Sequence, residues 1–143
     1  MKIMAVDYGD ARTGLAVCDR TEFLASPIGT IEERDFITLV GKVAHIAKEY
    51  EVGEIVVGLP LNMNGSFGPR AQACKTFADA LNEVAEVPVN MWDERSTTVS
   101  AHGILNETNV RGKKRKQVVD TVAATIILES YLEFRRKKKE RGE

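Results

Sequence analysis

Acidic side chains stand at the ends of two apolar runs in this sequence. Asp7 closes the run Ile3–Asp7, and Asp93 with Glu94 follows the run over residues 88–92. In open α/β sheets, ligands bind beyond the carboxyl ends of the strands. Carboxylates gathered there repel one another unless a cation lies between them, and oxygen ligands without histidine or cysteine favour Mg²⁺ or Mn²⁺. Two simpler interpretations remain open: Asp7 could cap the following turn, and Asp93 and Glu94 could form ion pairs.

A further carboxylate lies in a C-terminal segment that has helical spacing. In an α-helix, Asp120 shares one face with the residues at positions 124, 127 and 131, which are Ala124, Ile127 and Tyr131. Asp120 therefore belongs to the apolar stripe, near its start. A buried carboxylate without a partner is costly, so the position favours a cation ligand. The alternative is an ordinary acid that the helix dipole favours near an N-terminus.

Apolar runs and helical periodicities predict the elements that must position these acids. Asp35 is a suitable N-cap for the first helix, and Pro27 and Gly29 favour an edge position for the third strand. Strands that alternate with helices predict an α/β fold, with a mixed five-stranded sheet and helices on both faces. We expect strands over 3–7, 15–18, 25–31, 55–57 and 88–92, and helices over 35–50, 66–84, 96–106 and 116–138.

Length and composition limit the class of protein. With 143 residues, of which 43% are hydrophobic and 29% charged, the chain fits one domain over residues 1–143. No apolar run approaches the roughly 20 residues of a membrane helix, and no leader-like segment is recognisable, so a cytoplasmic protein without a membrane partner is expected. Cys18 and Cys74 lack metal-ligand spacing and are expected to be reduced and inert.

Charge is distributed unevenly along the chain. Residues 1–110 carry a net charge of −7 and residues 111–143 a net charge of +6, which predicts a polyanion partner. Cations concentrate in two segments that we expect to be flexible, a loop at 108–116 and a tail at 136–143. The tail could be an arm that binds the polyanion, or it could simply be solvated. The loop could be merely solvated, or could grip a phosphate backbone through Lys113, Lys114, Arg115 and Lys116.

Four sequence blocks together resemble the YqgF family. They are DYGDARTG at 7–14, VVGLPLNMNGS at 56–66, WDERSTT at 92–98 and VVDTVAATIILESYL at 118–132. The blocks occur in the family's order and span nearly the whole chain. Members of this family are also described as RuvX-like Holliday junction resolvases or pre-16S rRNA nucleases. The resemblance implies a ribonuclease H-like fold.

The resemblance also implies the roles of the acids. Asp7, Glu94 and Asp120 take the catalytic and metal-binding positions, with Asp93 as the alternative to Glu94. Adjacent strand residues point to opposite faces, so only one of the two faces Asp7, and we favour Glu94. Two Mg²⁺ or Mn²⁺ ions are expected, with Asp7 as the bridging ligand: one activates the attacking water and the other neutralises the leaving oxygen. The implied products are a 5′-phosphate and a 3′-hydroxyl.

Other polar residues of these blocks are candidate substrate ligands. Arg12 and Arg95 could hold phosphates bidentately, or could form salt bridges with neighbouring acids. Thr97 and Thr98 could bind a phosphate with hydroxyls and helix-start amides, or could be ordinary N-caps. Asn62 lies in a loop that borders the predicted site.

The sequence thus predicts an endonuclease that hydrolyses phosphodiester bonds of structured nucleic acid. Its substrate would be an rRNA precursor, cut at the pre-16S 5′ end during ribosome biogenesis, or a four-way DNA junction of recombination and repair. A resolvase should act as a homodimer, whereas an rRNA nuclease could be a monomer. Two other classes stay open: a non-catalytic nucleic-acid or ribosome-associated binding module, and an actin- or hexokinase-like phosphotransferase. The latter would need two such domains.

Overall fold

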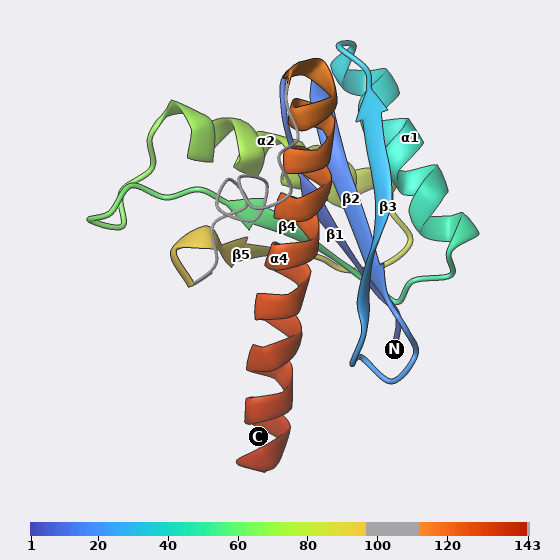
Figure 1. Ribbon diagram of the computed structural model, residues 1–143, viewed down its shortest axis with the longest axis vertical. Coiled ribbons are helices and arrows are strands. Elements are labelled where there is room, and N and C mark those ends of the chain that lie inside the picture. The colour runs from blue at the N-terminus through green and yellow to red at the C-terminus, as the bar shows by residue number, and fades with distance from the viewer. Residues whose placement is uncertain (97–111, 143) are drawn as a thin grey trace.

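The computed structural model describes residues 1–96 and 112–142, with side chains in the C-terminal helix described from residue 122 onward. The chain alternates strands and helices as the apolar pattern predicts (Figure 1). In chain order the elements are β1 (Ile3–Asp7), β2 (Arg12–Cys18), β3 (Ala25–Glu32), α1 (Phe36–Glu49), β4 (Glu54–Leu59), α2 (Pro69–Val84), β5 (Val89–Asp93), the 3₁₀ turn η1 (Glu94–Ser96) and α4 (Gly112–Glu140).

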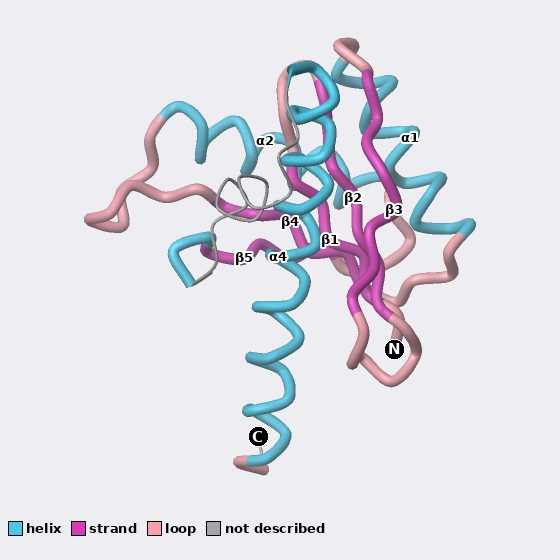
Figure 2. Tube along the Cα trace, viewed as in Figure 1, coloured by secondary structure: helices cyan, strands magenta, loops and turns pink. Residues whose placement is uncertain are grey.

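The strands form one mixed five-stranded sheet, in the order β3-β2-β1-β4-β5. β1 pairs antiparallel with β2, and β2 with β3, whereas β4 runs parallel to both β1 and β5. Helices α1 and α2 cover one face and α4 covers the other (Figure 2). The predicted fold class is therefore confirmed, including the edge position of β3 that Pro27 and Gly29 suggested.

Two hydrophobic cores lie on the two faces of the sheet. In β1, Met4 and Val6 join the core under α1 and α2, whereas Ile3 and Ala5 join the core under α4. This alternation follows the pleat of a strand, in which successive side chains point to opposite faces. The next residue, Asp7, continues the series that faces α4. Both cysteines, at positions 18 and 74, are free and buried, as the sequence led us to expect.

Helix starts follow local chemistry. The Asp35 carboxylate accepts a hydrogen bond from the Thr38 amide at 3.0 Å, which confirms its predicted role as N-cap of α1. Helix α2 starts at Pro69, three residues later than the start that we placed at residue 66. Proline suits the first helical position because the amide that it lacks would have no partner within the helix there. The loop between β4 and α2 therefore spans residues 60–68.

Helix α4 departs from the sequence expectation at both ends. It starts at Gly112, so Lys113 to Lys116 lie in its first turns and not in a flexible loop. It extends to Glu140, so most of the predicted flexible tail is helical. Lysine, arginine and glutamate have high helix propensities, and Glu133 pairs with Lys137 one turn later at 3.3 Å. The helix expected at 96–106 lies outside the described residues, apart from Ser96 in η1.

Within residues 1–96 and 112–142, no helix is both long and apolar enough to cross a bilayer.

Candidate active site

Asp7 lies between two glycines at the carboxyl end of β1. Its partner in the antiparallel strand β2 is Gly14. In the parallel strand β4, Val57 is level with Val6, which places Gly58 beside Asp7. Neither neighbour carries a side chain, so groups on the face that α4 covers can approach the sheet backbone closely next to Asp7.

The Glu94 side chain lies over Gly58. A Cβ added to Gly58 would stand 2.9 Å from a carboxylate oxygen of Glu94 and 2.6 Å from Cδ1 of Ile127 on α4. Glu94 therefore shares the α4 face with Asp7, although it comes from the turn after β5. Burial raises the pKa of the Glu94 carboxyl, and the Arg70 cation opposes that rise. Proximity of two acids in a partly buried site is the arrangement that a bound cation would stabilise.

The pKa of the Cys74 thiol in α2 is affected by the same acids. Burial is the main reason that the pKa of its thiol is raised to about 11, against a lowering effect of Arg70. Glu94 and then Asp7 raise it further by smaller amounts. Both acids thus act on one buried group, which agrees with their common place at this edge of the sheet.

Asp93 points away from these acids. The register of β5 sets Trp92 level with Gly58 and Asp93 level with Leu59. Trp92 packs into the core under α4, so Asp93 faces the opposite side of the sheet. Its carboxylate accepts hydrogen bonds from the Arg95 guanidinium at 2.7 and 3.1 Å, and these bonds lower its pKa. The geometry favours Glu94 over Asp93 as the partner of Asp7.

Asp120 is placed only through the backbone of α4. It precedes Ile127 by seven residues, or about two turns, and shares its helix face. Ile127 lies at Gly58, near the carboxyl end of β4, whereas Tyr131 bonds Glu54 at the start of that strand. The helix therefore runs toward the carboxyl edge as it approaches residue 120. Among the described side chains, which exclude that of Asp120, no group of three metal-ligating residues is present.

Of the predicted phosphate ligands, two arginines form ion pairs with acids, and the others are not described or are described only by their backbone. Arg12 pairs with Glu32 of β3 at 3.4 Å, so its ion pair is with an acid outside the candidate site. Arg95 binds Asp93 and also donates to the Met63 carbonyl at 3.1 Å, which matches the alternative that we left open for it. Thr97 and Thr98 lie outside the described residues. For the basic residues 113–116, only their helical backbone is described.

Asn62 shapes the loop between β4 and α2. Its side-chain amide donates to the Ser66 hydroxyl at 3.0 Å, and its backbone carbonyl accepts from the Gly65 amide at 2.8 Å. Gly65 adopts a φ of 85°, a conformation that favours glycine. The Arg95 guanidinium lies against this turn, so the loop and the segment after β5 hold each other in place.

Arg70 was not among the residues that the sequence suggested. It is the second residue of α2, its guanidinium lies 3.7 Å from the Asp10 carboxylate, and it stacks over the Tyr8 ring at 5.3 Å. It also lowers the pKa of Glu94. The sequence could have suggested Arg70, because the helix that follows a parallel strand starts at the carboxyl edge of that strand, where ligands bind. Arg70 adds a half-exposed cation beside the candidate acids.

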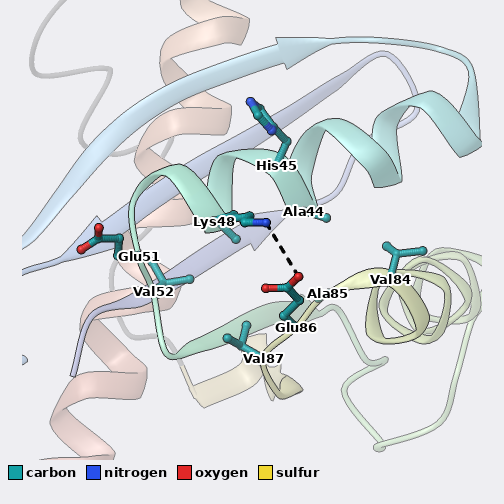
Figure 3. Close-up of a pocket in the computed structure, with 10 residues that line it drawn as sticks. Ala44, His45, Lys48, Glu51, Val52, Val84, Ala85, Glu86 and Val87 are labelled. Atoms are coloured by element: carbon teal, nitrogen blue, oxygen red, sulfur yellow. Dashed lines mark ion pairs between the residues drawn. The ribbon is translucent and has the colours of Figure 1, made fainter.

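A pocket of about 350 Å³ lies elsewhere, on the face covered by α1 and α2 (Figure 3). Alanine and valine side chains line it, and an ion pair of 3.8 Å between Lys48 and Glu86 crosses its rim. The sheet separates it from the acids on the α4 face, so it has no part in the candidate site.

Comparison with known proteins identifies the family. The family model described as RuvX, Holliday junction resolvase, matches residues 1–134. The chain belongs to this family. A protein of Bacillus cytotoxicus named "Putative pre-16S rRNA nuclease" is 43% identical over 136 residues, covering 93% of this chain and 98% of that protein. A protein of Halothermothrix orenii with the same name is 44% identical over 141 residues, covering 96% and 98%.

Solved structures show the same fold. The RuvC of Thermus thermophilus, in complex with a Holliday junction substrate, has a TM-score of 0.58 at 14% identity and covers 94% of this chain and 96% of that chain. The Holliday junction resolvase of fowlpox virus has a TM-score of 0.53 at 14% identity, covering 93% and 99%. The ribonuclease H-like fold and the family resemblance are confirmed, and RuvX membership supports a nuclease role.

Proposed function

We propose that this RuvX-family chain is a divalent-metal-dependent endonuclease that hydrolyses phosphodiester bonds in structured nucleic acid. The observation that carries the proposal is that Asp7 and Glu94 both lie next to Gly58, on the sheet face that α4 covers. Family membership supports the reaction class. The substrate is the 5′ region of pre-16S rRNA, with four-way DNA junctions as the second candidate.

The donor set fits Mg²⁺ or Mn²⁺. Asp7 and Glu94 offer hard carboxylate oxygens, and both residues lie next to Gly58. Asp120 would complete the set from α4, as a position on the helix face that carries Ile127. The ions, two in this proposal, would supply an activated water and a counter-charge for the leaving oxygen. Asp93 has no part in the set because Arg95 occupies its carboxylate.

The chain's own residues would orient the substrate. Arg70 lies at the start of α2, directly after the loop 60–68, and Arg95 lies after β5 and contacts the same loop at Met63. Planar guanidinium groups bind phosphate oxygens in pairs, so Arg70 would hold a phosphate next to the scissile bond, and Arg95 would do so by exchanging Asp93 for the phosphate. The cations at 113–116 lie on the first turns of α4, before Asp120, and would bind the backbone on the helix side. Arg12 would have to exchange its ion pair with Glu32 in the same way.

The names of relatives favour RNA over DNA as substrate. The two relatives described above carry the name of a pre-16S rRNA nuclease, whereas the family description names junction resolution. A junction resolvase must cut two symmetric strands, which requires a two-fold dimer with two sites. Cleavage of one rRNA end needs a single site. We therefore propose rRNA processing first, carried out by a monomer, with dimerisation expected only if junctions are cut.

The test is a direct cleavage assay on both substrates. Wild type and Asp7→Asn would be incubated with a pre-16S rRNA 5′ fragment and with a four-way DNA junction, with and without Mg²⁺ or Mn²⁺. The expected result is metal-dependent cleavage of the rRNA fragment by wild type, with none by Asp7→Asn at equal binding. Substrate binding by wild type without any metal-dependent product would contradict the proposal and support the non-catalytic binding module.

A further inference from the structure

We propose that the C-terminal end of α4 and the edge strand β5 form a second nucleic-acid contact, which holds the flank of the substrate beyond the cleavage site. We call it the flank track, and it rests on the proposed function. Its residues come from the end of α4, the residue after it and one residue of β5, and the rings of Trp92 and Phe134 connect the two elements. They are Trp92, Phe134, Lys137, Lys138 and Arg141.

Helix α4 leaves the body at a firmly held point. Its buried stripe ends with Leu132, which is 1% exposed. Three residues later, the Arg135 guanidinium pairs with Glu22 at 2.6 Å and with Glu54 at 3.5 Å, and both acids are buried. Beyond this anchor the helix projects past the sheet (Figure 1). Residues 136–140 are exposed, so the arm is available to a partner and its direction is set by the buried ion pairs.

The cations of the arm divide between two faces. At 100° per residue, positions 134, 137 and 138 share one side of the helix, and positions 135 and 139 share another; Arg141 follows the last helical residue. Lys139 belongs to the body-facing side, since it lies 3.7 Å from Glu22. Lys137 pairs with Glu133, but both side chains are more than half exposed and such a pair is readily exchanged. The side with Phe134 therefore presents cations outward.

Aromatic contacts connect this side to the candidate site. The ring of Phe134, 40% exposed, lies 5.2 Å from the Trp92 ring of β5. The Trp92 indole donates to the Ser130 hydroxyl at 3.0 Å, and that hydroxyl donates to the Ser96 carbonyl at 3.4 Å. Ser96 ends the turn that starts with Glu94. An unbroken series of contacts thus runs from the candidate site along β5 to the basic arm.

The chemistry of this surface matches a phosphate backbone. Cations bind phosphates and release counterions, and an exposed aromatic ring offers a stacking surface. The first 110 residues carry a net charge of −7, so the basic helix is the part of the chain that attracts a polyanion most strongly. Lys138 follows Ile127, which marks the site, by eleven residues. At 1.5 Å per residue and 3.4 Å per base pair this is about 16 Å, or about five base pairs.

The test compares two sets of charge removals in a protein that cannot cleave. The flank variant carries Lys137→Gln, Lys138→Gln and Arg141→Gln, and the control carries Lys42→Gln, Lys48→Gln and Lys75→Gln on α1 and α2. Both are made in the Asp7→Asn background and titrated with substrates whose flanks are about three or about twelve base pairs. The flank variant should bind the long substrate about tenfold to a hundredfold more weakly, with its salt slope reduced by about two to three. The control should match the parent.

Three further outcomes decide the matter. Equal binding of the short substrate by the flank variant and the parent supports the flank track, because the short flank does not reach the arm. An unchanged affinity and salt slope with the long substrate overturns it, even if the enzyme cleaves normally. Loss of long-flank binding in a protein whose wild type shows no nuclease activity supports the flank track and contradicts only the proposed function.

Discussion

One carboxylate oxygen of Glu94 lies 2.9 Å from the point at which a Cβ on Gly58 would stand. The Gly58→Ala variant must therefore displace Glu94, together with the end of the Ile127 side chain. We expect the cleavage rate to fall by about a hundredfold, because a shift of 1 Å in a catalytic group has that effect. Stability should fall by only about 1 kcal/mol, since both displaced groups are flexible ends. Single-turnover cleavage and urea unfolding would measure the two effects.

Gly41→Ala is the matched control. No atom lies within 4 Å of the Cβ that it would add, and the position is exposed in α1. Alanine should raise stability by up to about 1 kcal/mol there and leave cleavage unchanged. If Gly58→Ala cleaves as fast as Gly41→Ala, the position of Glu94 does not matter to the reaction.

Removing the charge of Glu94 should reduce cleavage far more than removing the charge of its neighbour Asp93. Glu94→Gln should reduce cleavage by about a thousandfold or more, because a bound metal supplies several kcal/mol of transition-state stabilisation. Asp93→Asn weakens a partly exposed ion pair with Arg95 and should cost less than about tenfold. Cleavage rates at saturating Mg²⁺ would decide between them. The reverse ranking would return the ligand role to Asp93.

Arg70 should contribute to cleavage and little to stability. Its pair with Asp10 at 3.7 Å is exposed, so Arg70→Met should leave the unfolding midpoint nearly unchanged. Loss of a charge-assisted bond to phosphate should lower kcat/KM by about tenfold to a hundredfold. Lys75→Met on the same helix is the control, because Lys75 pairs only with Asp79 among the described residues. Equal activity of both variants would remove Arg70 from the site.

Glu22 should make stability depend on pH. Its bonds with Arg135 are the main reason that its pKa is lowered from 4.5 to about 2. A lowered pKa means that the stabilisation is fully present above pH 4.5 and is lost as pH falls through about 2. Glu22→Gln should therefore cost about 3 kcal/mol at pH 7, with a difference from wild type that shrinks below pH 4.5.

Urea unfolding of both proteins between pH 3 and pH 7 would measure that difference. Glu33→Gln is a suitable control, because Glu33 forms an exposed pair with Lys42 and its loss should have a small effect. A Glu22→Gln protein whose stability runs parallel to that of wild type over the whole range would show that the buried pair does not stabilise the fold.

Local sequence patterns predicted most of the fold. The features that they did not predict depend mainly on long-range contacts. The end of β1 at Asp7 and the Asp35 cap follow from neighbouring residues, so sequence was sufficient for them. The start of α4 at Gly112 was missed because lysines and arginines show no apolar periodicity, although they favour helices. The bond between Glu22 and Arg135 joins residues 113 positions apart, and no local pattern encodes it.

Some residues of the candidate site could likewise be predicted from local patterns, and others could not. Asp7 and Glu94 were recognisable because each follows an apolar strand, and the alternation of faces along a strand allowed only one of Asp93 and Glu94 to face Asp7. Arg70 was missed because its relation to Tyr8 and Asp10 depends on where α2 starts relative to β1. The glycines beside Asp7 matter only through strand register, which the sequence alone did not specify.

Binding of Mn²⁺ in solution tests the central claim most directly. Free Mn²⁺ would be followed by electron paramagnetic resonance during titration of wild type, Asp7→Asn and Glu94→Gln, with circular dichroism to verify that each is folded. We predict that wild type removes Mn²⁺ from solution and that either substitution weakens this binding by about tenfold or more. If both folded variants bind Mn²⁺ as tightly as wild type does, Asp7 and Glu94 do not share a metal ion.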